Sequence, residues 1–253
     1  MLFLITTLLF SAYADCSHGQ FELCTSNNCK VTWDFVLLVT TWPGYFCSTK
    51  CCDSPTRLNG VMTDGFTMHG WWPSFSSGSM PACCTYATNR TNVKSTVEAD
   101  NDFLDEVAYS WPSLSNCEFF LYEYDKHGVC LTNIYKGVEG PKQYGRAAMK
   151  LLKTADAWTV FKAAGAVADG KTAINKQTLL NALGKQIGVT NAAYFRCSGD
   201  YVSELRYCTS VQSFDIDNPY FQECTSKVLS KDNCGSSVIF MKELSLTPSG
   251  CGY

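Results

Sequence analysis

Hydrophobic positions change their spacing along the chain, and each spacing predicts a different element. The stretch TWDFVLLVTTW, residues 32–42, is rich in β-branched and aromatic residues and ends at Pro43-Gly44, which predicts a buried strand. Residues 95–110 have a helical pattern that stops at Trp111-Pro112. Residues 48–92 are rich in cysteine and have the character of loops.

The second half of the chain is predicted to begin with helices and to end in strands. Residues 141–166 carry Ala, Lys, Leu and Met at helical spacing and predict two helices broken near Thr154-Ala155-Asp156. Residues 172–188 predict a further amphipathic helix. From Ala193 onward, short extended segments alternate with cysteines. Helices and strands without regular alternation predict one α+β domain, while FFLYEYDKHG, residues 119–128, fits either a strand or a helix.

The first residues have the pattern of a secretory signal peptide. An apolar run fills residues 2–10, and Ala12-Tyr13-Ala14 supplies a small-x-small cleavage site. We therefore expect a signal peptide over residues 1–14 and a single domain over residues 15–253. The alternative is a buried N-terminal segment, because the usual basic residues before the run are missing. No stretch approaches the roughly 20 apolar residues that a membrane span needs, so we expect no membrane association.

Composition narrows the class of protein. The chain has 253 residues, of which 46% are hydrophobic and 17% charged, which is typical of a globular protein and not of a disordered one. The formal net charge is −3 and no basic patch is legible, so charge-driven nucleic-acid binding is not the first expectation. An enzyme that holds its substrate briefly remains compatible with this charge.

Fifteen cysteines agree with an oxidising compartment, where each disulfide contributes about 2–4 kcal/mol. A metal site is disfavoured, because the chain has no Cys-x-x-Cys and only three histidines. We expect no metal and no cofactor. The odd count leaves at least one thiol over or paired between chains. Asn89-Arg90-Thr91 is a glycosylation sequon that could be used in this compartment.

Two of the histidines carry the candidate chemistry. His69 lies in GFTMHGWWPS and His127 in EYDKHGV. Each is followed by glycine, which allows a close approach or a tight turn. Either histidine alone, in such aromatic and apolar surroundings, would more often be a buried core residue than a catalytic one. His18 lies in a polar stretch and is predicted to be on the surface.

Taken together, two histidines suit the cleavage of RNA. RNA carries its own nucleophile, the 2′-hydroxyl, so cleavage needs a base to deprotonate it and an acid to protonate the leaving 5′-oxygen. Histidine fills either role near neutral pH. Lys126 could stabilise negative charge on the phosphorane, and Glu123 could orient the site or tune a histidine. This reaction needs no metal.

These two segments resemble the signatures of the ribonuclease T2 family, usually written Phe-Thr-Ile-His-Gly-Leu-Trp-Pro and His-Glu-Trp-x-Lys-His-Gly-Thr-Cys. Further segments match the family, and their order and spacing agree over residues 33–130: WPGYFC at 42–47, Cys51-Cys52, and WPSL at 111–114. The cysteines between 197 and 234 also resemble the family's C-terminal pattern.

The resemblance implies a fold and an activity. The fold would be a single α+β domain with a central, mostly antiparallel sheet flanked by helices and many disulfides. The activity would be that of a metal-independent endoribonuclease that cleaves single-stranded RNA through a 2′,3′-cyclic phosphate with low base specificity. Single-stranded RNA is the implied partner, with no obligate protein partner. The implied location is extracellular or lysosomal-vacuolar, reached through the secretory pathway.

By position, the resemblance also implies roles for individual residues. His127 would be the general base and His69 the general acid. Lys126 and Glu123 would support the phosphate in the transition state. Trp72 would contact the ribose or base, with core packing as the alternative, since a stacked base contributes roughly 1–3 kcal/mol. Trp71 is expected to be structural.

The resemblance further implies a set of disulfides. The implied pairs are Cys47–Cys51, Cys52–Cys117, Cys197–Cys234 and Cys208–Cys224, with Cys130 joined to Cys83 or Cys84. Local spacing would allow Cys24–Cys29, and the two chain ends could be tied together through Cys16 and Cys251.

Three positions depart from the family pattern. Tyr122 stands where a phosphate-binding histidine is common; it can donate a hydrogen bond but carries no positive charge near neutral pH. Ser74 and Thr41 replace residues near base-recognition positions, so the family's base preference does not transfer. These departures keep a second hypothesis open, a catalytically weakened secreted RNA-binding or cytotoxic protein. A third, a structural or interaction protein, leaves both histidine motifs unexplained.

Overall fold

The computed structural model describes residues 16–26, 32–58, 65–85, 90–242, 246, 248 and 251–253. The predicted signal peptide, Cys29 and the sequon residue Asn89 lie outside the described residues. In the part of the chain that is described, no helix is long and apolar enough to cross a membrane.

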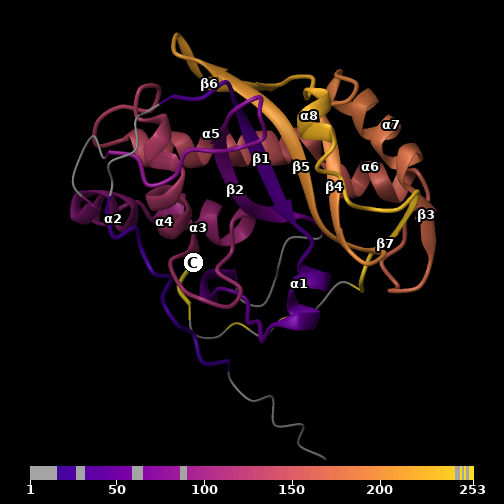
Figure 1. Cartoon of the computed structure of the whole chain (residues 1–253). Helices are drawn as coiled ribbons and strands as arrows, with labels where there is room; N and C mark the ends of the chain where they lie inside the picture. Colours follow the sequence, from indigo (N-terminus) through magenta and orange to yellow (C-terminus); the bar gives the residue numbers. More distant parts are fainter. Residues whose placement is uncertain are drawn as a thin grey trace, which may run out of the picture.

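The described strands form one sheet of seven strands in the order β2-β1-β5-β7-β3, with β4 and β6 also pairing with β5 (Figure 1). All of the pairings are antiparallel except that of β5 with β7. This confirms the expected mostly antiparallel sheet. The strands are β1 (Phe35–Thr41), β2 (Thr67–Ser74), β3 (Ala173–Asn175), β4 (Ala193–Ser198), β5 (Tyr201–Gln212), β6 (Asp215–Phe221) and β7 (Ser237–Ile239).

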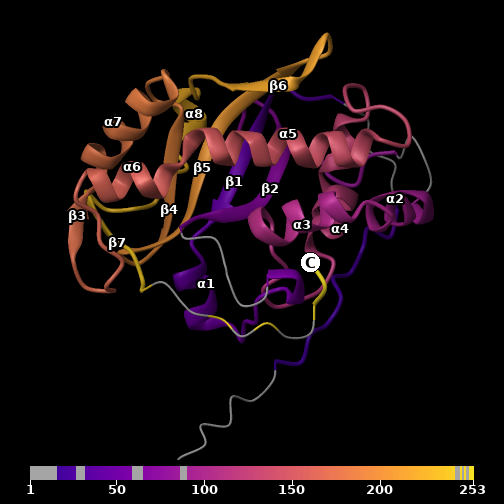
Figure 2. The same ribbon diagram turned by 180° about the vertical axis from the view of Figure 1, so that it is seen from behind.

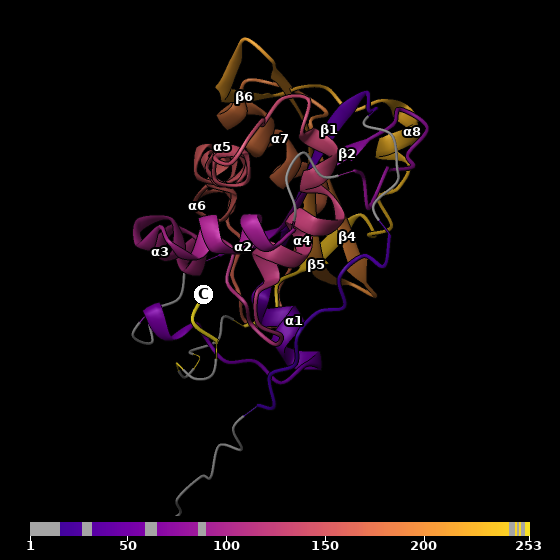
Figure 3. The same cartoon turned by 90° about the vertical axis from the view of Figure 1, so that its left-hand side faces the viewer.

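Helices cover both faces of this sheet. The described α-helices are α1 (Pro43–Thr49), α2 (Arg90–Glu98), α3 (Asn101–Ser110), α4 (Phe119–Lys126), α5 (Gly140–Ala155), α6 (Ala157–Ala163), α7 (Lys176–Ile187) and α8 (Ser226–Leu229), with 3₁₀ turns η1 (Thr56–Leu58) and η2 (Gly128–Leu131). Helix α5 crosses one face of the sheet (Figure 2). In Figure 3, α5 is seen end-on to one side of β1 and β2, and α8 lies on the other side.

Strand β1 is buried on both of its faces. Val36 and Leu38 point into the main core beneath the helices, and Leu37 and Val39 point into a smaller cluster that includes Val228 of α8. A strand covered on both sides reads as a continuous apolar run without alternation. This explains why the run at residues 32–42 predicted a buried strand correctly.

The helix predictions need two corrections. In the helix predicted over residues 172–188, residues 173–175 form strand β3 and α7 begins only at Lys176, where the Asn175 side chain caps it. The break near residue 155 is confirmed, because α5 ends at Ala155 and Asp156 has a left-handed backbone (φ 39°) before α6 begins. The single helix predicted over residues 95–110, however, is two helices. Asp100 separates them, because its carboxylate accepts a hydrogen bond from the Phe103 N–H and so caps the start of α3.

Residues 48–92, which were predicted to be loops, contain a strand. Strand β2 lies inside this segment and pairs with β1 along its whole length. The pairing shifts between Val39↔Gly70 and Thr40↔Met68, which leaves His69 as an extra residue in a β-bulge. The bulge breaks the two-residue period, so the segment was wrongly predicted to be only loops.

Seven disulfides connect the described cysteines, and three of the implied pairings are present. These are Cys197–Cys234, Cys208–Cys224 and, for Cys130, the choice of Cys84 as its partner. Fourteen of the fifteen cysteines are thereby paired, and the remaining one, Cys29, lies outside the described residues.

The other expected pairings are wrong. Cys47 is bonded to Cys52 instead of Cys51, and Cys117 is bonded to Cys251 instead of Cys52. The remaining two bonds are Cys16–Cys51 and Cys24–Cys83, in place of the local Cys24–Cys29 pair and the Cys16–Cys251 tie between the chain ends. The physical reason is spatial: the N-terminal segment runs past Cys51 and the C-terminal end reaches Cys117, neither of which spacing reveals.

Candidate active site

The bulge in β2 brings His69 and Trp72 to the same face of the sheet. Residues three apart in a regular strand point to opposite faces, but the extra residue at position 69 cancels this, and the two rings lie 4.9 Å apart. Trp71 turns the other way into the core, where its Nε1 donates to Thr209 Oγ1 at 2.8 Å. The backbone of the bulge is held by Trp111, whose Nε1 donates to the His69 carbonyl at 3.0 Å.

The segment before His127, whose sequence fits either a strand or a helix, is a helix. Helix α4 places Tyr122 and Lys126 four residues apart, and Glu123 and His127 four residues apart at its C-terminal end. Side chains at this spacing lie on one side of a helix. The His127 N–H donates to the Glu123 carbonyl at 2.9 Å and so closes the last turn.

Glu123 joins the strand to the helix. Its side chain is only 2% exposed; Oε2 accepts a hydrogen bond from Trp72 Nε1 at 2.6 Å, and Oε1 lies 3.8 Å from Nε2 of His69. Burial raises the pKa of Glu123, while the charge of His69, the Trp72 hydrogen bond and the charge of Lys126 act in the opposite direction. The Glu123 carboxylate is therefore positioned by the Trp72 hydrogen bond, and the charge of His69 favours its ionised form.

Both glycines that follow the histidines are required by close approaches. A Cβ atom on Gly70 would collide with Trp72 Nε1 and with the Glu123 carboxylate. A Cβ atom on Gly128 would collide with the ring of Tyr124. The glycines thus allow neighbouring side chains to approach, which is one of the two roles expected from the sequence.

Glu204 and Arg206 on β5 belong to the site, although the sequence did not single them out. His69 Nδ1 donates to Glu204 Oε1 at 2.7 Å, which leaves Nε2 directed toward Glu123. Glu204 Oε2 in turn accepts from Arg206 Nε at 2.8 Å and Nη2 at 2.6 Å. Glu204 lies 135 residues from His69 and is brought near by the strand order β2-β1-β5, so no local motif could have found it.

The two histidines have opposite electrostatic surroundings. Burial alone would lower the pKa of His69, but the Glu204 hydrogen bond and the charges of Glu123 and Glu204 outweigh it and raise this pKa. For His127, which is 3% exposed, burial and the charges of Lys126 and His69 lower the pKa to about 3, against a small opposing effect of the Pro81 carbonyl. The surroundings thus favour the protonated form of His69 and the neutral form of His127.

Glu204 remains ionised beside His69. Burial acts to raise the pKa of Glu204, but the His69 hydrogen bond and the Arg206 charge lower it to about 2. Arg206 also lies over the Trp72 ring, with 5.5 Å from its guanidinium carbon to the ring centroid. A fixed negative charge therefore faces His69 throughout the ordinary pH range.

All six residues predicted to be catalytic or substrate-binding line one cavity of about 840 Å³. The Trp72 ring centroid lies 4.9 Å from each of the histidine rings, and Lys126 Nζ donates to the Tyr122 hydroxyl at 3.0 Å. Thr41 also lines the cavity. Ser74 is buried and donates its hydroxyl to the Trp72 carbonyl at 2.9 Å.

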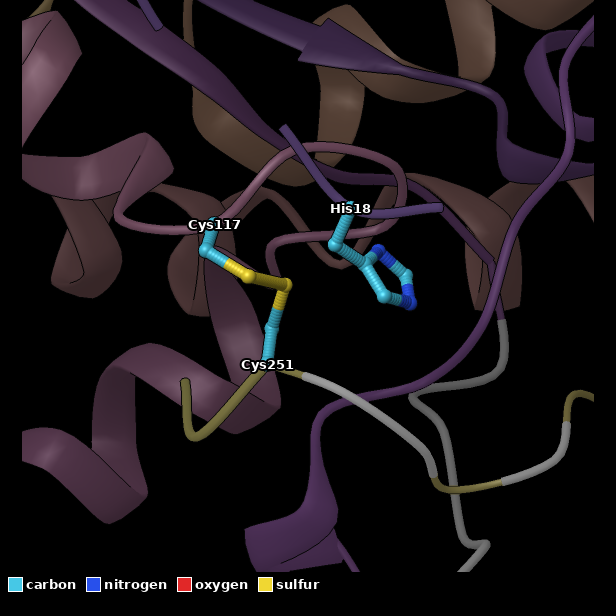
Figure 4. Close-up of side chains that lie close together, drawn as sticks. All are labelled: His18, Cys117 and Cys251. Carbon is cyan, nitrogen blue, oxygen red and sulfur yellow. A yellow bond between two sulfur atoms is a disulfide. The ribbon is translucent and has the colours of Figure 1, made fainter. Parts of the chain in front are cut away.

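His18 is not on the surface, contrary to the prediction. Its Nδ1 lies 2.9 Å from the Ser115 carbonyl oxygen and its Nε2 3.0 Å from Asp53 Oδ2. Figure 4 shows its ring beside Cys117 and Cys251. Among the described residues this is the one group of histidine, cysteine or carboxylate side chains within reach of a shared metal ion. The two sulfur atoms are bonded to each other, so they are not available as thiolate ligands.

The chain is similar in sequence to known proteins of one family. The ribonuclease T2 family model matches residues 33–224. Extracellular ribonuclease LE of Solanum lycopersicum is 26% identical over 220 residues, covering 84% of this chain and 89% of that protein. Ribonuclease DdI of Dictyostelium discoideum is 26% identical over 201 residues, covering 78% of this chain and 83% of that protein.

Solved structures share the fold. The structure of Actibind, described as a T2 ribonuclease, superposes with a TM-score of 0.65 at 22% identity and covers 87% of this chain and 98% of that one. The structure of RNase NT in complex with 5′-AMP gives a TM-score of 0.63 at 21% identity, covering 83% of this chain and 98% of that one.

Proposed function

Because the chain belongs to the ribonuclease T2 family and is an endoribonuclease, we propose that it cleaves single-stranded RNA by transphosphorylation, with His127 as base and His69 as acid. The observation that carries this assignment is the opposite effect of the surroundings on the two histidines. A base must begin neutral and an acid must begin protonated, and these are the states that the lowered pKa of His127 and the raised pKa of His69 favour.

The reaction balances with these two groups alone. His127 takes the proton of the 2′-hydroxyl, and the 2′-oxygen forms a bond to phosphorus. The bond from phosphorus to the 5′-oxygen breaks, and His69 gives its proton to that oxygen. The products are a 2′,3′-cyclic phosphate and a 5′-hydroxyl end. With the roles of the histidines reversed, water opens the cyclic phosphate to a 3′-phosphate. Each transfer typically contributes about 10²–10⁴-fold to the rate.

The remaining residues hold the reacting groups. Glu204 fixes His69 through Nδ1, so that Nε2 is the nitrogen left for the leaving oxygen. Lys126 places a positive charge in the cavity, where the phosphorane gains negative charge. Tyr122 offers a neutral hydrogen bond to the phosphate, weaker than the charge-assisted bond a protonated histidine would make.

The proposal extends to substrate and location. Similar solved structures include RNase NT in complex with 5′-AMP and an RNase MC1 mutant in complex with 5′-UMP, and we propose that the present cavity also takes RNA nucleotides. Seven disulfides suit an oxidising compartment. A relative from tomato is named as extracellular. We therefore propose that residues 1–14 direct the chain, as a single catalytic domain, into the secretory pathway.

The test is cleavage of a short single-stranded RNA by the purified oxidised protein from pH 4 to 8, with and without EDTA. Product ends are read by mass spectrometry, and His127→Ala is compared with wild type. We expect EDTA-insensitive cleavage that yields a 2′,3′-cyclic phosphate and falls by about 10²–10⁴-fold in the variant. If folded wild-type protein bound RNA without cleaving it, the weakened RNA-binding alternative would replace this proposal.

A further inference from the structure

A segment outside the family match forms one wall of the active site. Residues 16–26, which we call the strap, precede residues 33–224 that match the family. The strap runs past α4, seen in Figure 1 as the indigo trace beside α4 and α2. Ser17 and Phe21 of the strap line the same cavity as His69 and His127.

The strap is fixed at both of its ends and along its length. Disulfides join Cys16 to Cys51 and Cys24 to Cys83. Between these bonds, the Gly19 carbonyl accepts a hydrogen bond from the Cys117 N–H at 3.0 Å. The Cys24 N–H donates to Asp125 Oδ2 of α4 at 2.7 Å. A side chain on this segment is therefore held in place before substrate arrives, and little conformational entropy is lost when it is used for binding.

Phe21 is the strap side chain that meets the site. Its ring stacks on Tyr122, with centroids 4.4 Å apart and an interplanar angle of 18°, and lies 5.3 Å from the ring of Phe119. The Phe119 ring is in turn 5.7 Å from His69. A row of aromatic rings thus leads from the proposed acid, through Phe119, to the strap.

We propose that Phe21 is a substrate-binding residue that packs against the nucleobase of the leaving nucleoside. This inference rests on the proposed role of His69: the oxygen that His69 protonates belongs to that nucleoside, so its base lies on the side where Phe119 and Phe21 stand. Base–aromatic stacking tolerates any base. Stacking needs no positive charge on the protein, which suits a chain with a formal net charge of −3.

Two substrates separate this role from a structural one. A dinucleoside monophosphate has a leaving nucleoside, whereas hydrolysis of a nucleoside 2′,3′-cyclic phosphate has none. In Phe21→Ala, we expect kcat/KM for the dinucleoside monophosphate to fall by about five- to 20-fold, the low end of what a stacked base contributes. Hydrolysis of the cyclic phosphate should stay within about twofold of wild type, and Phe21→Tyr should restore dinucleotide cleavage.

Leu23→Ala is the matched control, because Leu23 is on the same strap, is 37% exposed and does not line the cavity. We expect it to leave both reactions unchanged. Equal losses on both substrates in Phe21→Ala would show that the ring only supports Tyr122, and unchanged rates would show that it contacts no base; either result overturns the inference. A folded wild-type protein that cleaves neither substrate would refute the two-histidine function itself, and this inference with it.

Discussion

At the scale of single residues, the site works by giving two chemically identical side chains different surroundings. His127 is buried against Trp72 beside the positive charge of Lys126, whereas His69 faces the carboxylates of Glu204 and Glu123. Coulombic and desolvation effects of this kind separate the pKa values of an acid and a base. The difference requires no difference in residue type, and so it is invisible in the sequence.

The pH profile should show this separation. Activity requires neutral His127, so it is lost as pH falls through a pKa lowered to about 3; it requires protonated His69, so it is lost as pH rises through a raised pKa. We expect kcat/KM to have its acidic limb well below the ordinary histidine pKa and its basic limb above it. Lys126→Gln should move the acidic limb to higher pH, because a charge that lowers the pKa of His127 is gone. An acidic limb near pH 6.5 in wild type would contradict this assignment.

Glu204→Gln should move only the basic limb of the pH profile. The amide keeps a hydrogen-bond acceptor for His69 Nδ1 but loses the negative charge that raises the pKa of His69. The basic limb should therefore shift to lower pH, with activity reduced at pH 8 and little changed at pH 5, and NMR titration of His69 should report the same shift. Glu106→Gln, at an exposed site on α3, is the control. A uniform loss at every pH would indicate that Glu204 only positions the ring.

At the scale of elements, a strand bulge and a short helix make the site. The bulge turns His69 to the side of Trp72, and α4 sets Glu123 and His127 one turn apart. Strand β1 could be predicted from the sequence, because a strand that is covered on both faces has a continuous apolar run. Strand β2 could not, because a bulge breaks its period, and α4 spans only eight residues, too few for its pattern to exclude a strand.

Gly70→Ala tests how closely these two elements must approach. Its Cβ atom would collide with the Trp72 indole nitrogen and the Glu123 carboxylate, so the strand or the helix must move. We expect a loss of stability of about 1–3 kcal/mol, as for overpacked sites, and a fall in kcat/KM of about 10²-fold, as for small misplacements of reacting groups. Urea unfolding and steady-state kinetics measure the two effects. Gly235→Ala, where an added Cβ atom would lie at an ordinary 3.6 Å from the Ser237 carbonyl oxygen, should change neither.

At the scale of the whole molecule, disulfides fasten both ends of the described chain to the domain. Cys16–Cys51 and Cys24–Cys83 hold the strap, and Cys117–Cys251 holds the C-terminal end beside His18. The cysteine-rich composition predicted that such bonds exist, and the family resemblance gave Cys197–Cys234, Cys208–Cys224 and, for Cys130, the choice between Cys83 and Cys84. The resemblance gave wrong partners for Cys47, Cys52 and Cys117. Cys51 and Cys117 are bonded to Cys16 and Cys251, near the two ends of the described chain, and the sequence does not reveal where those ends run in space.

The charge of the whole molecule predicts how binding responds to salt. Lys50 and Lys126 are the lysines that line the active-site cavity, and no arginine among the described residues does so. For single strands, log K falls with log[salt] with a slope of about −0.7 per phosphate contact. If these two lysines make one or two phosphate contacts, RNA affinity should fall by about three- to sevenfold between 50 and 200 mM salt. Proteins that make six to ten contacts lose roughly 10³–10⁵-fold over the same range.

Fluorescence titration of a short, uncleavable 2′-deoxy oligonucleotide at several salt concentrations measures this slope. Lys126→Gln should make the slope shallower by the amount that one phosphate contact contributes. Phe21→Ala should weaken binding but leave the slope unchanged, since stacking releases no counterions. A steep slope in wild type would mean that RNA follows charges outside the cavity. The shallow slope expected here follows from a net charge of −3 and a cavity walled by aromatic rings, in which bases and not phosphates supply most of the affinity.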